Sequence, residues 1–201
     1  MLFSDTYLTI EQKADIIFKD KGSKFLSFAF PVENDIQIKE ALSQLKKEHP
    51  SANHHCYAYR LGADKLNFRA NDDGEPNNTA GKPILGQIQS NDLTNILIVV
   101  VRYFGGTLLG VSGLINAYKT SAAEAIKECT IIEKFISFNY AINFPFEQLN
   151  DVMKLLKQTD CKIISQQFDN DCEISFSVRK ANAEVCEEKL KKLNGLKLEY
   201  K

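Results

Sequence analysis

The sequence has almost no net charge, because its 25 lysines and arginines are balanced by 26 aspartates and glutamates. A strong overall field that would attract nucleic acid is therefore excluded, and any basic surface must be local. The longest aliphatic run, residues 96–101, is too short to span a membrane. Residues 1–15 lack the basic stretch and apolar run of a signal peptide. We therefore expect no membrane partner.

The cysteines form no recognisable pattern. There are five, an odd number, and no two are spaced as CxxC; they are Cys56, Cys129, Cys161, Cys172 and Cys186. This spacing argues against a disulfide framework and against a structural zinc site. A reduced, cytoplasmic setting is the expectation that follows.

Familiar motifs of catalysis and cofactor binding are also missing. The P-loop spacing, the GxGxxG spacing, the GxSxG nucleophile elbow and the twelve-residue calcium loop do not occur. We therefore expect no cofactor, no metal and no catalytic residue. Metal binding by the carboxylates of Asp72, Asp73 and Glu75 remains the alternative to their use as turn formers and helix caps.

The second half of the chain predicts the order βαββαβ, the ferredoxin-like pattern. Residues 134–144 alternate between apolar and polar side chains, as a strand does. Residues 146–158 and 182–194 carry helical apolar stripes, and a turn is expected at 169–171. The remaining strands are predicted at 161–168, 172–178 and 196–200.

The first half predicts strands and helices around one buried strand. Residues 95–101 are apolar on both faces of a strand, and Asn34 with Gln37 forms the capping-box signal of a helix. Further helices are expected from residue 81 or 83 and from about 114 to 128. Further strands are expected at 24–30, 54–61 and 66–70. We predict an α+β protein with two domains, residues 1–133 and 134–201.

Two segments, 71–82 and 104–113, are predicted to be loops. Seven of the ten glycines lie between Gly74 and Gly113, and three of the four arginines precede or lie within this region. Arginine forks to phosphates and carboxylates, so the arginines either build a binding surface or pair with the loop's own carboxylates. The residues expected to shape the loops are Asp72, Asp73, Gly74, Glu75, Pro76, Gly81, Gly105, Gly106, Gly110 and Gly113.

The adjacent histidines His54 and His55 cannot form a chelating pair, because neighbouring residues of a strand face opposite sides of the sheet. Alternation predicts His54, Cys56 and Arg60 on one face and His55 with the tyrosines on the other. A structural role is favoured for at least one histidine over catalysis.

Four strings carry a resemblance to the YigZ/IMPACT family: KGSKF, HPSANHHCYAYRLG, DDGEPNNTAGKPIL and VVVRYFGGTLLGVSGLINAYKTSA. They stand in the family's order over roughly residues 20 to 125, and the second half resembles the small ferredoxin-like domain of bacterial members. Asn77 and Asn78 depart from the serine or glycine pair usual in the family. The resemblance implies a first domain with the fold of ribosomal protein S5 domain 2.

The resemblance also implies an association with translation, and the leading hypothesis is a non-enzymatic regulator that binds RNA, the ribosome or a translation-related protein. Its binding surface would combine the two loops with Arg60, Arg69, Lys82, Arg102, Lys119, His54 and Tyr103. A rival hypothesis is a hydrolase-type enzyme with a metal or acid/base site between the 71–82 and 104–113 loops. A third is a protein-interaction module, which would show an apolar patch with exposed aromatics in place of a basic one. The oligomeric state is left open.

Overall fold

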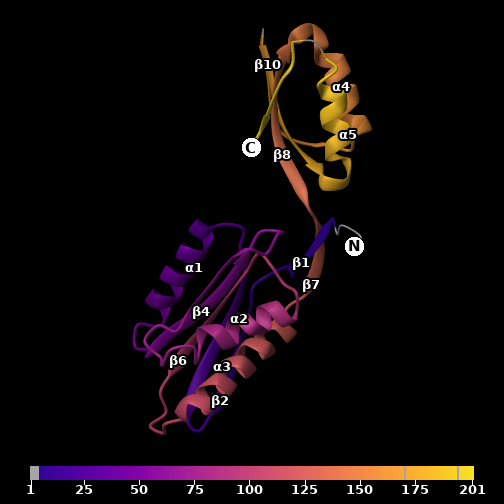
Figure 1. Ribbon diagram of the computed structural model, residues 1–201. Helices are drawn as coiled ribbons and strands as arrows, with labels where there is room; N and C mark the ends of the chain where they lie inside the picture. The colour runs from indigo at the N-terminus through magenta and orange to yellow at the C-terminus, as the bar shows by residue number, and fades with distance from the viewer. Residues whose placement is uncertain (1–4, 170, 194) are drawn as a thin grey trace. The chain divides into compact units, whose positions relative to one another are not determined.

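The computed structural model describes residues 5–169, 171–193 and 195–201. The chain divides into two compact units of mixed α/β structure, Tyr7–Lys134 and Phe135–Lys201, the latter joined by Asp5 and Thr6 (Figure 1). Residues 1–4, Asn170 and Asn194, which the domain, turn and helix predictions include, lie outside the described residues.

The first unit is built on a five-stranded sheet with the order β2-β3-β6-β4-β5. Its neighbouring strands are all antiparallel. Helix α1 lies on one side of the sheet and helices α2 and α3 on the other (Figure 1). The elements are β2 (Ala14–Asp20), β3 (Ser23–Pro31), α1 (Asp35–Glu48), β4 (His54–Leu61), β5 (Asn67–Asn71), α2 (Gly81–Ser90), β6 (Ile96–Tyr103) and α3 (Gly110–Lys127).

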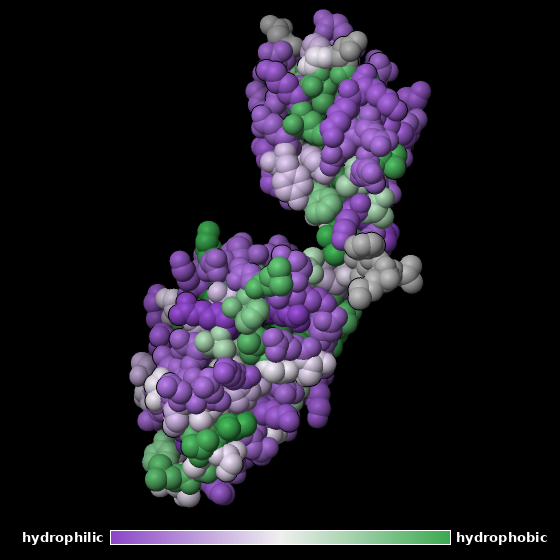
Figure 2. Space-filling view, viewed as in Figure 1, coloured by the Kyte–Doolittle hydropathy of each residue, from purple (hydrophilic) through white to green (hydrophobic). Residues whose placement is uncertain are grey.

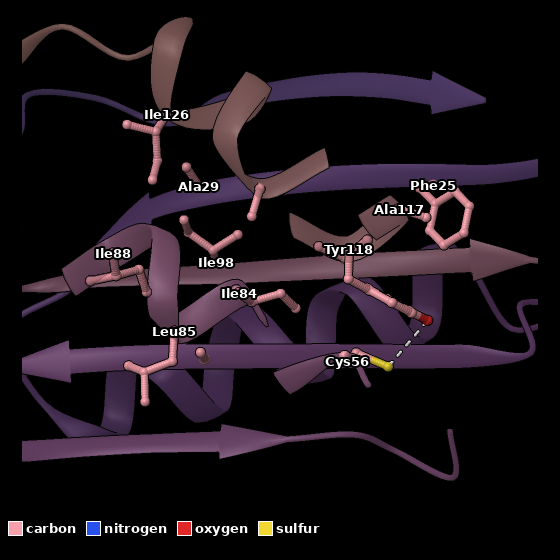
Figure 3. Packing of buried hydrophobic residues seen from close by; sticks show 14 of the residues in the cluster. Phe25, Ala29, Cys56, Ile84, Leu85, Ile88, Ile98, Ala117, Tyr118 and Ile126 are labelled. Carbon is pink, nitrogen blue, oxygen red and sulfur yellow. Dashed lines mark hydrogen bonds between the residues drawn. The ribbon is translucent and has the colours of Figure 1, made fainter. Parts of the chain in front are cut away.

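The central strand β6 is buried on both faces, as its apolar sequence predicts. Ile98 and Val100 pack with α2 and α3, while Val99 and Val101 pack with α1. Figure 3 shows Ile98 among the α2 side chains Ile84 and Ile88 and the α3 side chain Tyr118. Strand β4 alternates as predicted, with Cys56 on the α2/α3 side and Leu61 on the α1 side.

Helix α1 begins where the capping signal predicts. The Asn34 side chain accepts hydrogen bonds from the backbone N–H groups of Ile36 (3.1 Å) and Gln37 (3.0 Å). The Gln37 side chain in turn accepts from the N–H of Glu33 at 2.7 Å, one residue before the position that a standard capping box uses. The Asn34 side chain therefore satisfies two of the first backbone donors of the helix.

The second unit has the element order β8-α4-β9-β10-α5-β11 that its sequence predicts, with the sheet order β11-β8-β10-β9. Its core joins both helices to one face of this sheet. A short 3₁₀ turn, Phe146–Gln148, precedes α4. The elements are β8 (Ser137–Pro145), α4 (Leu149–Gln158), β9 (Lys162–Phe168), β10 (Asp171–Arg179), α5 (Lys180–Leu190) and β11 (Lys197–Tyr200).

Three strands were not predicted: β1 (Thr6–Ile10), β2 and β7 (Ile131–Phe135). Strand β2 is a partly exposed edge strand, so its apolar residues give a weak periodic signal, and β1 pairs with β7 more than 120 residues along the chain. Helix α3 begins at Gly110, not near 114, since packing of Leu114 and Tyr118 outweighs the low helix propensity of its glycines. No helix among the described residues is long and apolar enough to cross a membrane.

Candidate functional site

Loop 71–82 is organised by the side chain of Asp72. Its carboxylate accepts hydrogen bonds from the backbone N–H groups of Asn78 (2.8 Å), Ala80 (3.0 Å) and Gly81 (2.8 Å). Ala80, the residue that precedes α2, has no side chain that could cap the helix. Asp72 therefore caps α2 from eight residues away, which is the helix-cap role that the sequence offered for the loop carboxylates.

Replacement of Asp72 by alanine is expected to lower the free energy of unfolding by about 1–2 kcal/mol, the usual effect of removing a helix cap. Asp72→Asn, which keeps one acceptor oxygen, is expected to lose less. Urea denaturation followed by circular dichroism measures both. Equal stability of Asp72→Ala and the wild type would show that water replaces the cap without cost.

Asp73 ties the same loop to β4. It has a positive φ of 42°, its carboxylate accepts from the N–H of His55 at 2.7 Å, and its carbonyl oxygen lies 2.9 Å from Nδ1 of His54. A carbonyl only accepts, so Nδ1 of His54 carries a proton and donates. Nε2 of His54 is then directed to the Glu75 carboxylate, 3.8 Å away.

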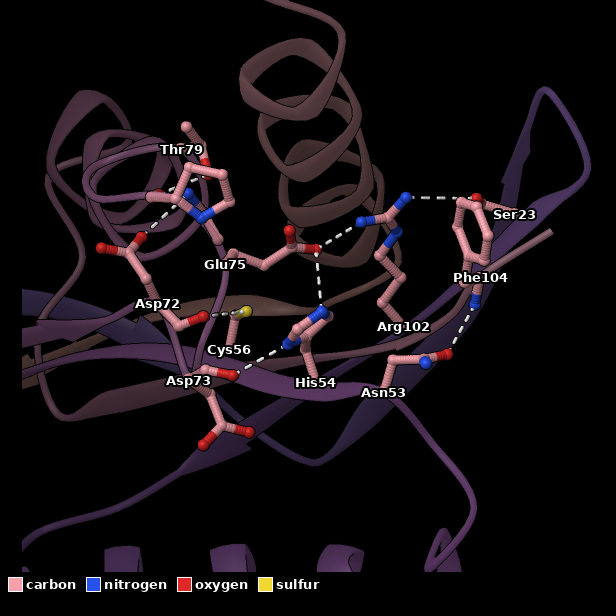
Figure 4. Close-up of polar contacts among 12 residues, drawn as sticks. Ser23, Asn53, His54, Cys56, Asp72, Asp73, Glu75, Thr79, Arg102 and Phe104 are labelled. Carbon is pink, nitrogen blue, oxygen red and sulfur yellow. Dashed lines mark hydrogen bonds and ion pairs between the residues drawn. The ribbon is translucent and has the colours of Figure 1, made fainter. Parts of the chain in front are cut away.

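Arg102 and Glu75 form a buried ion pair in which Nη1 donates to Oε1 at 2.6 Å. The residues are 5% and 8% exposed. The hydroxyl of Tyr118 donates to the same carboxylate oxygen at 2.8 Å. Figure 4 shows the Glu75 carboxylate between His54 and Arg102. Of the two interpretations of the arginines, the structure selects pairing with a loop carboxylate for Arg102.

A second set of contacts anchors loop 104–109 next to this ion pair. The N–H of Phe104 donates to Oδ1 of Asn53 at 2.8 Å, and the N–H of Gly105 donates to Oγ of Ser23 at 3.3 Å. The guanidinium carbon of Arg102 lies 5.7 Å from the Phe104 ring centre, within the range of a cation–π contact. The loop is thus fixed at its start to the first residue of β3 and to the residue that precedes β4.

The two loops and the first turn of α3 enclose a pocket of about 440 Å³. His54, Glu75 and Arg102 supply its polar part, and side chains of loop 104–109 and α3 supply its apolar wall. Leu108 is 85%, Val111 60% and Phe104 44% exposed. Figure 2 shows hydrophobic residues gathered over the lower end of this unit, the end at which α3 begins in Figure 1. The lining residues are Asn53, His54, Glu75, Pro76, Arg102, Phe104, Leu108, Leu109, Gly110, Val111 and Leu114.

The structure distributes the sequence-predicted binding residues over more than one surface. Only His54 and Arg102 of that set are among the residues that line the pocket. Arg69 lies opposite Tyr59 in the β4–β5 pairing and therefore on the α1 side of the sheet, where Tyr103 contacts Nδ1 of His49 at 3.0 Å. Lys82 and Lys119 are exposed on α2 and α3.

Arg60 is occupied by two neighbouring loops, since it donates to the carbonyl oxygens of Lys65 (3.4 Å) and Leu93 (3.3 Å). Leu108, Leu109, Val111 and Leu114 were missed as site residues. A signal was present for Leu108 and Val111, because aliphatic residues in a segment that the sequence predicts to be a loop have no regular element in which to be buried.

Among the described residues, no group of three or more histidine, cysteine, aspartate or glutamate side chains could hold a metal ion. Burial strongly raises the pKa of the Tyr118 hydroxyl and of the Cys56 thiol, and the neighbouring Glu75 adds to both effects. Both groups therefore stay protonated and act as hydrogen-bond donors at neutral pH.

The model of the Impact N-terminal domain matches residues 21–126, which contain both loops, the ion pair and the pocket. The chain belongs to the IMPACT family. It is 34% identical to the IMPACT family member YigZ of Escherichia coli, over 82% of this chain and 81% of that protein. It is 38% identical to Protein IMPACT-B of Xenopus tropicalis, over 45% of this chain and 30% of that protein.

A crystal structure described as a hypothetical protein matches this IMPACT family member with a TM-score of 0.77 and 30% identity. The match covers 98% of this chain and 97% of that one. The family match ends at residue 126, before β7. All residues that line the pocket therefore lie within the matched part of the chain.

Proposed function

We propose that this IMPACT family member is a cytoplasmic, translation-associated regulatory protein that acts by binding a partner. Its domains would be residues 1–133, with the fold of ribosomal protein S5 domain 2, and residues 134–201, with a ferredoxin-like fold. The βαββαβ order of the second unit supports the latter assignment.

The observation that carries the proposed binding mode is the exposed apolar rim of the pocket, formed by Phe104, Leu108 and Val111. Exposed aliphatic side chains around a hollow are typical of a surface that docks on another protein. The arginine at this surface is neutralised by Glu75 and buried, so it offers little to a phosphate. We therefore favour a protein of the translation apparatus over bare RNA as the partner.

Co-sedimentation with ribosomes across a salt series tests this proposal. We expect association that persists at high salt and that falls at least about tenfold in Leu108→Asp, because a charge at the centre of an apolar contact removes a hot spot. Ile36→Asp is the matched control, since Ile36 is 67% exposed on α1 and outside the pocket.

Two other outcomes would redirect the proposal. Association that weakens steeply with salt, and that depends on Lys82, Lys119 or Arg69 but not on Leu108, would make RNA phosphates the target. No association at low salt would overturn the ribosome as partner.

The hydrolase-type enzyme remains a second candidate because of one observation. The Asp73 carbonyl orients His54 so that Nε2 faces the pocket and Glu75, as in a general base held by a neighbouring acceptor. Assays for hydrolysis on the purified wild type and variants distinguish this enzyme from a binding protein. Turnover of a small ester or phosphoester that is lost in His54→Gln and kept in Leu108→Asp would favour the enzyme.

A further inference from the structure

Two cysteines of the second unit lie side by side. Cys161 stands between the end of α4 and the start of β9, Cys186 lies on α5, and their Sγ atoms are 3.6 Å apart. Both are free thiols. Cys186 is 1% exposed, whereas Cys161 is only partly buried and is the residue of the pair nearer to solvent.

The turn that carries Cys161 holds the two sulfur atoms together. The N–H of Cys161 donates to the carbonyl oxygen of Leu156 at 2.9 Å, after Asp160 has taken a positive φ of 54°. The carbonyl of Thr159 accepts from the side chain of Asn182 on α5 at 3.4 Å. The turn therefore contains Cys161 and is also hydrogen-bonded to α5, the helix that carries Cys186.

Thr159 also places its hydroxyl next to both thiols, 3.2 Å from Sγ of Cys161 and 3.6 Å from Sγ of Cys186. The hydroxyl can donate to Cys186 in place of the Leu155 carbonyl, which it contacts at 2.9 Å. The hydrogen bond from Cys161 lowers the pKa of the Cys186 thiol to about 7, against the opposing effect of burial, while the same hydrogen bond and burial raise the pKa of Cys161. A thiolate, the nucleophilic form of cysteine, is thus accessible to this pair near neutral pH.

The other three cysteines have different surroundings. The thiols of Cys56, Cys129 and Cys172 each have a backbone carbonyl oxygen as partner. Burial raises the pKa of Cys56 and Cys129, as it does that of Cys161, so what sets the pair apart is the contact between its two sulfur atoms. Oxidation should therefore distinguish the Cys161–Cys186 pair from the rest of the thiols in the chain.

We propose that Cys161 and Cys186 are a site of reversible oxidation at which a hydroperoxide converts the two thiols into a disulfide. A disulfide requires the sulfur atoms at about 2.0 Å, so the pair must close by about 1.5 Å from its 3.6 Å separation. Within the turn that carries Cys161, Asp160 is exposed, so this movement falls on a segment that is only partly buried.

The chemistry proceeds in two steps that balance. One thiol of the pair loses its proton, and its sulfur attacks one oxygen of hydrogen peroxide to form a sulfenic acid; the O–O bond breaks, and the departing hydroxide takes up that proton as water. The second thiol then loses its proton and attacks the sulfenic sulfur; the S–O bond breaks, and the departing hydroxide takes up the second proton as a second water. The two thiols lose two electrons in total, and the peroxide gains them.

Non-reducing peptide mapping of the wild-type protein tests the proposal without any substitution. The reduced protein is treated with hydrogen peroxide, alkylated and digested. We expect loss of two of the five alkylatable thiols, a peptide pair that joins Cys161 to Cys186, and full recovery after dithiothreitol. A link between other cysteines, a sulfinic acid at Cys161, or unchanged alkylation of both residues would overturn the proposal.

Two variants serve as controls. Cys172→Ser, which replaces another buried cysteine of the same unit, should still form the Cys161–Cys186 link, whereas Cys161→Ser should not. The oxidised wild type should also melt at a higher temperature than its reduced form, because the link restricts the unfolded chain. Peroxide should leave the melting temperature of Cys161→Ser unchanged.

Discussion

Replacement of Arg102 by alanine is expected to lower the free energy of unfolding by about 3–5 kcal/mol. The substitution removes the cation that neutralises the Glu75 carboxylate at 2.6 Å and leaves Glu75, which is 8% exposed, without that partner. Desolvation of an unpaired charge is more costly than the loss of the attraction itself. Urea denaturation, with comparison of the midpoint and the slope, measures the change.

Two further variants show whether the loss of stability comes from breaking the ion pair or from removing any arginine. Arg69→Ala removes an exposed arginine of β5 and should change stability by less than about 0.5 kcal/mol. The double variant Arg102→Leu with Glu75→Leu removes both charges and should recover part of the loss, because replacement of a whole buried pair by apolar groups is often neutral. If Arg102→Ala were as stable as the wild type, the pair would have to be solvated in solution.

Replacement of Gly105 by alanine is expected to destabilise the first unit by about 2–3 kcal/mol, in the range of an overpacked site. An added Cβ would lie inside contact distance of the backbone carbonyl group of Gly22 and the backbone nitrogen of Ser23. Backbone atoms cannot rotate away as a side chain can, so loop 104–109 would have to leave the β2–β3 turn. We expect partner binding through Leu108 to fall together with stability.

Gly86→Ala is the control for this prediction. Gly86 lies inside α2, and an added Cβ would meet no heavy atom within 4 Å. Alanine should therefore raise stability by about 0.5–1 kcal/mol through its higher helix propensity. Thermal and urea unfolding of both glycine variants provide the comparison. Equal stability of Gly105→Ala and Gly86→Ala would show that the close approach of the two turns is absent in solution.

Several features of the fold follow from local patterns in the sequence. Three examples are the period-two alternation of β4, the two-sided apolar sequence of β6 and the Asn34 cap of α1. Each depends on residues that are only a few positions apart in the sequence. Hydrophobic periodicity and capping chemistry report such neighbours directly. The same is true of the βαββαβ order of the second unit.

The contacts of the site depend on residues far apart in the chain, which local periodicity does not report. Arg102 meets Glu75 across 27 residues and Ser23 across 79, and Gly105 lies against Gly22 because β3 pairs with β6. Cys161 similarly meets Cys186 only through the packing of its own unit. The sequence by itself determined which residues could carry charge, cap a helix or fill a core. Only the tertiary structure decided that Arg102 is neutralised inside the protein, and that leucine and valine form the rim of the pocket, because strand pairing and helix packing select each residue's partners.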